Sequence, residues 1–345
     1  MSATSWPTSC RPSRCRCPDS CMAGTSQPRP PGAGSDLDSD RPARSQVPAP
    51  NGRERTMRRP CPIHGRLTET TATPFARDGW RLVTCDETGF VYLPDPPAYE
   101  ALAEDHAWEA TSTAERARRR REEPVFAALS AAFKHVRTRL FASRSPFATI
   151  LRTRLAGTTL RPPWRVVDVG CADGAFTARV ARRVMDDGFP VRVVGIEVSR
   201  ALVARARETL AELGGEAFEA AAIDGIRSLP AASVDAVLMS SFLEHEARPL
   251  ELLRAVRRAL RPGGFVIVKV PNFACWNRTL RGARWCGFRY PDHVNYFTPR
   301  TLRMLTEEAG LVFEQGPLDR LPVSDNMYAV LVRAAESRAT IRLAA

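Results

Sequence analysis

The sequence predicts an α/β fold with a doubly wound, mostly parallel sheet of seven strands. Short apolar runs rich in β-branched residues alternate with segments of helical periodicity between residues 165 and 310. The first apolar run breaks into a glycine-rich turn that opens a helix, and the last two runs can pair antiparallel. Such alternation is typical of a parallel sheet with helices on both faces.

The first strand is the apolar run 166–169, and the turn after it contains Gly170 and Gly174. Residues 177–185 have the spacing of a helix. Glycine allows a tight turn and lets a ligand approach the backbone. A dinucleotide-binding turn has glycine at its first, third and sixth positions, but here the third and sixth are alanine. The spacing therefore disfavours NAD-dependent oxidoreduction.

The remaining elements follow in the same alternating order. Further parallel strands are predicted over residues 191–197, 217–223, 234–240 and 265–270. Helices are predicted from Ser199 to near residue 214, over 250–260 and over 299–309, and an antiparallel pair over 311–318 and 328–333. The second strand ends in Glu197, about twenty residues after the glycine turn, where an acidic residue binds ribose hydroxyls in doubly wound folds.

These motifs resemble class I S-adenosylmethionine-dependent methyltransferases from residue 162 to about 332. An acidic residue followed by G-x-A-x-G is similar to motif I of that family, with alanine where the middle glycine usually lies. Leu-Glu-His, a helix, Leu-Arg-Pro-Gly-Gly and a strand resemble the family's later region. The resemblance implies a Rossmann-like fold and S-adenosylmethionine as cofactor. The cofactor contacts that it implies come from Asp168, Gly170, Ala172, Gly174, Glu197, Asp224 and Ser240.

The resemblance also implies methyl transfer to an oxygen or nitrogen atom of a small-molecule acceptor, such as a sugar, a quinone or a secondary metabolite. One alternative is an RNA methyltransferase, although no Asn/Asp-Pro-Pro-aromatic signature follows the fourth strand. A second alternative is a catalytically silent S-adenosylmethionine-binding protein.

Residues 271–297 form a long aromatic segment after the fifth strand. We expect it to cover the carboxyl ends of the strands and to wall the acceptor, or else to pack a small core of its own. His293 in this segment is predicted to be the general base, or at least the group that orients the acceptor. Its imidazole has an ordinary pKa near 6.5, suited to accepting a proton at neutral pH. His245 is the reserve candidate.

Residues 57–98 form a small N-terminal module that resembles the zinc knuckle ahead of some class I methyltransferases of polysaccharide and small-molecule biosynthesis. Cys61, His64 and Cys85 stand at ligand positions, but Thr88 occupies the fourth. Structural zinc takes four protein ligands, so a degenerate, metal-free remnant of the knuckle is predicted, and no metal-binding residues are assigned.

The composition gives few further constraints. The formal net charge is +12 and the pI is about 9.8, but Lys134 and Lys269 are the only lysines. This arginine bias looks like GC-rich coding, so a nucleic-acid partner is not expected. No apolar run has the length of a membrane span, and a cytoplasmic location is expected. The oligomeric state does not follow from the sequence.

The predicted organisation has five parts. A disordered tail over residues 1–56 is followed by the N-terminal module over 57–98, a helical linker over 99–160, the methyltransferase domain over 161–335 and a short tail over 336–345. The first tail holds Cys10, Cys15, Cys17 and Cys21, which are not expected to form a metal or disulfide site. Met57 is a candidate for the true start of translation.

Overall fold

The computed structural model describes residues 59–97, 117–118, 120–121, 124, 145–316, 319 and 321–335. The predicted tails, the four cysteines of the first tail and most of the predicted helical linker lie outside these residues. Within the described part, no helix is both long and apolar enough to cross a membrane.

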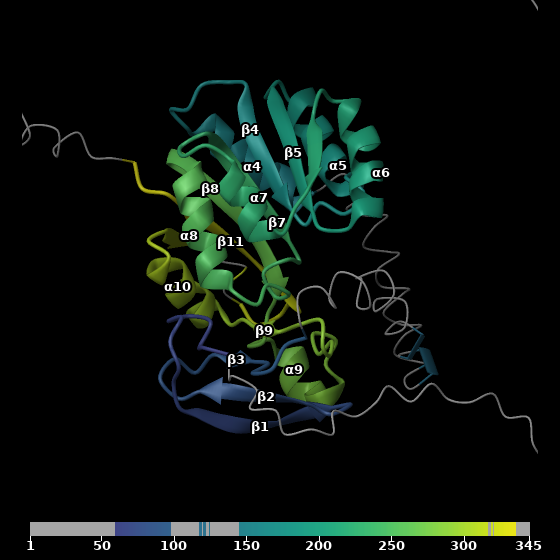
Figure 1. Cartoon of the computed structure of the whole chain (residues 1–345), viewed down its shortest axis with the longest axis vertical. Helices are drawn as coiled ribbons and strands as arrows, with labels where there is room; N and C mark the ends of the chain where they lie inside the picture. The colour runs from purple at the N-terminus through teal and green to yellow at the C-terminus, as the bar shows by residue number, and fades with distance from the viewer. Residues whose placement is uncertain are drawn as a thin grey trace, which may run out of the picture. The chain divides into compact units, whose positions relative to one another are not determined.

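The larger sheet has seven strands in the order β10-β11-β8-β7-β4-β5-β6 (Figure 1). Its parallel strands are β4 (Trp164–Val169), β5 (Val191–Glu197), β6 (Glu216–Glu219), β7 (Val234–Ser240) and β8 (Leu260–Pro271). β10 (Val312–Glu314) and β11 (Asn326–Val332) add the predicted antiparallel pair next to β8. The predicted fold class is therefore confirmed.

Helices cover both faces of this sheet. On one face, a hydrophobic core includes residues of α4 (Pro146–Ala156), α5 (Ala175–Asp186) and α6 (Arg200–Ala211). On the other, the core includes residues of α7 (Ala222–Ser228), α8 (Pro249–Ala259) and α10 (Pro299–Glu308). Burial of these apolar side chains on both faces is what the near-continuous apolar strands require.

The prediction for the third strand was wrong in its extent. β6 ends at Glu219, and α7 begins at Ala222, inside the segment that we expected to be a strand. The physical reason lies in residues 220–222, which are all alanine. Alanine has the highest helix propensity and is depleted in strands.

A second sheet combines the N-terminal module with the aromatic segment. Its order is β1-β2-β3-β9, with β1 (Thr70–Arg77), β2 (Trp80–Cys85), β3 (Val91–Tyr92) and β9 (Asn295–Tyr296). The aromatic segment also contains α9 (Trp276–Arg281) and a 3₁₀ turn over Gly282–Arg284. The N-terminal module and the long segment after β8 therefore share one sheet.

The buried aromatic residues of that segment pack a core with the N-terminal module. Phe273, Trp285, Phe288 and Tyr296 cluster with Leu82 of β2 and with other apolar residues of both parts. Trp285 and Phe288 are each only 1% exposed. Of the two expectations for this segment, the structure supports a small core for these side chains rather than a wall around an acceptor.

Arg59 ties the N-terminal module to the chain around β9. Its guanidinium donates to the backbone oxygens of Ala247, Leu93 and Val294, at 2.9, 3.3 and 3.1 Å, and to Asn295 Oδ1 at 2.8 Å. Arg59 is 9% exposed, and burial lowers its pKa to about 10. Burying a guanidinium charge without partners is costly, and these hydrogen bonds offset much of that desolvation cost.

Candidate functional site

The turn after β4 has the backbone shape that the glycine pattern predicts. Gly170 and Gly174 have φ angles of 72° and 77°, which glycine adopts without a steric penalty. Ala172 also has a positive φ of 49°, so its backbone is strained. The amides of Gly170 and Cys171 both donate to the Ile196 carbonyl, at 2.8 and 3.1 Å, which fixes the turn against β5.

Both glycines also allow close packing of protein groups. A Cβ added to Gly170 would lie 2.4 Å from the ring of Phe242, and one added to Gly174 would lie 3.2 Å from Ala206 Cα on α6. The space that we expected an approaching ligand to occupy is thus filled by protein at these two positions. Any cofactor contact from them would come from the backbone.

Glu197 lies at the end of β5, beside this turn. One carboxylate oxygen accepts from the Ala172 amide at 3.0 Å, and the other from the amides of Val198 and Ser199 at 2.9 and 3.0 Å. A carboxylate has about four acceptor positions, so about one remains for a ligand without breaking a backbone bond. The half-buried carboxylate fits a ribose hydroxyl, and this structural fit supports a nucleoside cofactor at the turn.

Asp168 is buried beneath the turn, with 1% exposure. Thr177 Oγ1 of α5 donates to its carboxyl group, which links the end of β4 to the helix. Burial raises the pKa of Asp168 to about 7, the nearby Glu197 carboxylate adds to the rise, and the Thr177 hydrogen bond opposes it. In this structure Asp168 supports the turn from below.

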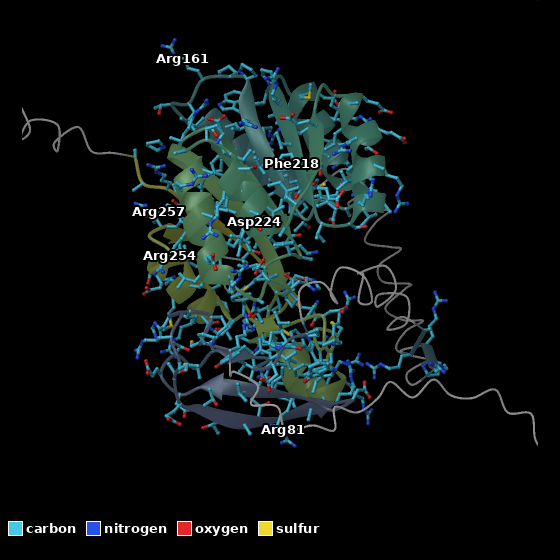
Figure 2. All side chains as sticks on the ribbon, viewed as in Figure 1. Arg81, Arg161, Phe218, Asp224, Arg254 and Arg257 are labelled. Atoms are coloured by element: carbon cyan, nitrogen blue, oxygen red, sulfur yellow. The ribbon has the colours of Figure 1, made fainter. Side chains whose placement is uncertain are left out.

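The other predicted cofactor residues lie in two different places. Ser240 ends β7 and is half-buried opposite Lys269 of β8. Asp224 does not end a strand, as we expected, but lies exposed in the first turn of α7 (Figure 2). A carboxylate there is favoured by the helix dipole whether or not a ligand binds.

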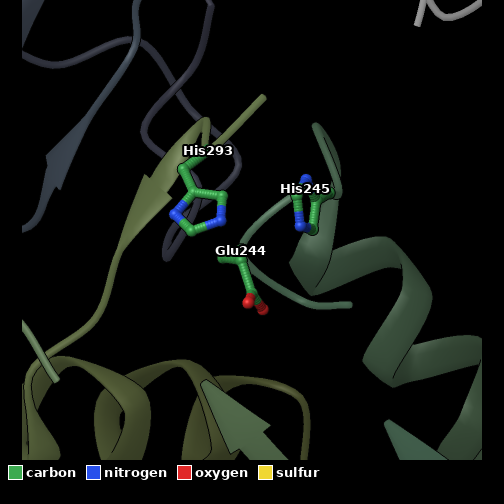
Figure 3. Close-up of side chains that lie close together, drawn as sticks. All are labelled: Glu244, His245 and His293. Carbon is green, nitrogen blue, oxygen red and sulfur yellow. The ribbon is translucent and has the colours of Figure 1, made fainter. Parts of the chain in front are cut away.

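His293, the predicted base, lies close to His245 and Glu244 (Figure 3). One potential ligand atom from each of the three side chains lies within 4.8 Å of the others, and the two imidazole rings are nearly perpendicular, with centroids 4.8 Å apart. The amides of Val294 and Asn295 both donate to the Glu244 backbone oxygen, at 2.9 and 3.1 Å. The structure therefore brings together the main and the reserve candidates for the base.

Backbone carbonyls fix the orientation of both imidazole rings. His293 Nδ1 lies 2.8 Å from the Gly287 oxygen, and His245 Nδ1 lies 2.9 Å from the Asp292 oxygen. A carbonyl oxygen can only accept, so each Nδ1 carries a proton, and in the neutral form of either ring the lone pair is on Nε2. Burial, with the nearby Arg289, lowers the pKa of His245 to about 4, which keeps that ring neutral.

Glu244 is the buried carboxyl group of this cluster, with 1% exposure. Burial raises the pKa of its carboxyl group to about 7, while Lys269 and Arg289 counteract part of the rise. Its Oε2 is buried without a hydrogen-bond partner among the residues that the structure describes. Unsatisfied buried carboxyl oxygens are costly, which makes Glu244 a candidate functional residue.

The knuckle positions of the N-terminal module do not form a comparable group. Thr88 Oγ1 lies 3.7 Å from Cys61 Sγ, Thr68 Oγ1 lies 3.2 Å from Cys85 Sγ, and His64 pairs with Glu87 at 3.8 Å. Within the described ranges, only the Glu244 cluster brings three possible metal ligands together. Threonine hydroxyls thus contact both thiols of the predicted remnant.

A family model for a methyltransferase domain matches residues 133–315, more than half of the chain. The chain belongs to this methyltransferase family. The match includes the glycine turn, Glu197 and the Glu244 cluster, so these features lie inside the methyltransferase domain. The cofactor of this class of enzymes is S-adenosylmethionine, in agreement with the sequence prediction.

The methyltransferase domain is also similar to individual proteins. The chain is 28% identical over 155 residues to the ubiquinone biosynthesis O-methyltransferase of Aeromonas salmonicida, covering 43% of this chain and 63% of that protein. It is 32% identical over 115 residues to an uncharacterized 37.1 kDa protein in transposon TN4556 of Streptomyces fradiae, covering 33% and 32%. The chain thus spans less than two thirds of each relative. A solved SAM-dependent methyltransferase from Aquifex aeolicus has a TM-score of 0.40 at 17% identity, covering 55% of this chain and 89% of that one.

Glu244 had no predicted role, although the Leu-Glu-His motif that contains it was part of the family resemblance. A carboxylate before a helix is commonly a cap or a surface charge, so the motif alone does not mark it. The signal that distinguishes Glu244 is a buried Oε2 without a hydrogen-bond partner in the described part of the chain, and this burial depends on β9 lying against the loop after β7. That juxtaposition joins residues far apart in the sequence.

Proposed function

We propose that this chain transfers the methyl group of S-adenosylmethionine to an oxygen atom of a small-molecule acceptor. The observation that supports this best is the group of Glu244, His245 and His293, in which both imidazole rings are held by backbone oxygens through Nδ1. Transfer to a hydroxyl oxygen releases a proton, and this group is suited to orienting the hydroxyl and accepting its proton. Methyl transfer to a nitrogen atom of the acceptor is the alternative form of the same reaction.

The residues around the glycine turn would hold the cofactor. Glu197 accepts a hydrogen bond from a ribose hydroxyl, and Asp168 supports the turn. Backbone groups from Gly170 to Gly174 contact the cofactor. The bound cofactor supplies a methyl group on a sulfonium sulfur. Most of the rate enhancement would then come from holding the acceptor oxygen in line with that methyl group.

The acceptor is proposed to be a small molecule. The ubiquinone biosynthesis O-methyltransferase of Aeromonas salmonicida supports a phenolic hydroxyl as the first class to test. The RNA alternative has less support, because many arginines of the described part form ion pairs, including Arg154 with Glu314, Arg254 with Glu308 and Arg261 with Asp235.

The proposal is tested by incubating the full chain with methyl-labelled S-adenosylmethionine and either a panel of phenols and sugars or total RNA. Label transferred to a phenol supports the proposal, and label only in RNA contradicts it. Binding without transfer to any acceptor favours the silent cofactor-binding alternative. Binding of NADH in place of S-adenosylmethionine contradicts the cofactor assignment.

His293→Ala tests the role of the imidazole group. We expect intact cofactor affinity and a turnover reduced by roughly 10²–10⁴, because the variant removes a positioned proton acceptor. Cofactor affinity is measured by calorimetry and turnover by label transfer, in separate experiments. His64→Ala in the N-terminal module is the matched control. Turnover within a few-fold of wild type would exclude His293 as a base.

A further inference from the structure

We infer that Glu244, His245 and His293 form a binding site for one divalent transition-metal ion. The three side chains offer a carboxylate oxygen and two imidazole nitrogens within 4.8 Å of one another. Zinc and related divalent ions bind this set of donors, whereas calcium and magnesium prefer oxygen ligands alone. Zn²⁺, Fe²⁺, Co²⁺ and Mn²⁺ are therefore the ions that fit.

The two histidines have the tautomer and the support of metal ligands. In metal sites a ligating histidine donates its other ring N–H to a backbone carbonyl or a carboxylate, which fixes the ring and its tautomer. His293 and His245 both make this contact through Nδ1, to the oxygens of Gly287 and Asp292. Their ring centroids are 4.8 Å apart, close to the ~5 Å expected for two imidazoles on one ion with bonds near 2.1 Å.

Glu244 supplies the independent observation. Its Oε2 has no hydrogen-bond partner among the described residues, and its side chain is almost fully buried. Two ligand atoms of a tetrahedral ion lie about 3.4 Å apart. The ligand atoms of the three side chains must therefore move slightly closer to one another when an ion binds. A carboxylate oxygen without a partner can make this movement without breaking a hydrogen bond.

The surrounding charges permit a cation. Arg289 and Lys269 both act on the Glu244 carboxyl group. The Arg289 guanidinium pairs with the Asp292 carboxylate at 3.3 Å, and Lys269 Nζ donates to Ser241 Oγ at 3.2 Å. The carboxylates of Glu244 and Asp292 thus balance the two basic groups before an ion binds, and histidine nitrogens supply most of its ligands.

Three protein ligands leave a position for a further group on the ion, as in catalytic zinc sites. A hydroxyl bound there loses its proton to solvent more easily, and its oxygen then forms the new O–CH₃ bond as the S–CH₃ bond breaks. His293 would in that case orient the acceptor through the ion instead of taking its proton. This catalytic step rests on the proposed function, whereas ion binding does not.

The test measures ion binding without cofactor or acceptor. The chelator-treated full chain is dialysed against Zn²⁺, and Co²⁺ is titrated while its visible absorption bands are recorded. We expect about one equivalent per chain and at least a tenfold weaker binding in Glu244→Gln and in His293→Asn, with circular dichroism as the check on folding. His64→Asn and Cys61→Ser control for binding by the N-terminal module.

Several results would overturn the inference. They are failure of Zn²⁺, Co²⁺ and Mn²⁺ to bind, equal affinity in Glu244→Gln and wild type, and loss of binding in Cys61→Ser. If a variant does not fold, nitrogen NMR of the imidazoles in the wild-type chain shows which histidines bind the ion. Zn²⁺ should then change two of the five histidines and leave His64 unchanged. A change confined to His64, or no change, would exclude the site.

Discussion

The carboxyl group of Asp168 makes the stability of this fold depend on pH. Its pKa rises from 3.8 to about 7 on folding, mainly through burial. Between these values the folded chain binds more protons than the unfolded chain, so the free energy of unfolding falls as the pH rises from about 4 to about 7 and then levels off. The protonated form is therefore the one that the fold favours.

Asp168→Asn should remove the part of this dependence that comes from Asp168. The amide keeps an oxygen for the Thr177 hydroxyl but has no proton to lose. Between pH 5 and pH 8, the difference in unfolding free energy between variant and wild type should shift by roughly 1–3 kcal/mol in favour of the variant. Urea unfolding at both pH values measures it, with Asp187→Asn as the control for loss of a negative charge. Parallel pH profiles for wild type and Asp168→Asn would contradict a buried, proton-binding Asp168.

Glu197→Ala should weaken the binding of S-adenosylmethionine. Hydrogen bonds to charged groups contribute roughly 1.5–3 kcal/mol each, so losing one bond predicts about a tenfold to more than a hundredfold higher Kd. Calorimetry on the folded variant measures the affinity, and Glu219→Ala at the exposed end of β6 is the control. An unchanged Kd would remove Glu197 from the cofactor site.

The predictability of individual residues depended on whether their partners are local. Glu197 could be proposed as a cofactor residue by counting from the glycine turn, because one helix and one strand determine that distance. His293 could be proposed as a base from its residue type and its segment, and this role stays a prediction. The burial of Glu244 could not be predicted, because it results from β9 packing against the loop after β7.

The glycine turn combines backbone conformation with close packing. Gly170→Ala places a Cβ 2.4 Å from the Phe242 ring at a φ of 72°, whereas Gly188→Ala has a similar φ of 87° and nothing within 4 Å. Both variants incur about 1–2 kcal/mol of backbone strain, and only the first adds roughly 1–3 kcal/mol of overpacking. Urea unfolding of the two variants isolates this packing cost. Equal destabilisation would mean that Phe242 moves aside freely.

At the level of elements, strands with β-branched residues were predicted well and the alanine-rich segment was not. β5 and β7 have the predicted bounds because apolar, mostly β-branched runs favour buried parallel strands. The apolar residues between positions 217 and 223 follow neither a clear helical period nor a clear strand period. The local pattern therefore could not distinguish a strand from a helix. The second sheet was also missed, because β9 has only two residues and pairs with a distant segment.

At the level of the whole molecule, the N-terminal module should be required for full stability. A chain that begins at Met57 keeps Arg59 and its hydrogen bonds, so its melting temperature and cofactor affinity should match those of the full chain. A chain that begins at residue 99 lacks β1 to β3 and leaves β9 without a partner strand. It should melt at a lower temperature and bind a hydrophobic dye. A large loss of stability in the first chain, or none in the second, would contradict this requirement.

The contact between Arg59 and Val294 also affects the order of folding during synthesis. These residues are 235 positions apart in the chain, and the pairing of β3 with β9 spans a similar separation. Closing such a long loop is entropically costly and slow. While a ribosome makes the intervening chain, β3 has no partner on its open edge, and unpaired strand edges promote aggregation. The nascent protein therefore depends on late residues to protect one of its earliest strands.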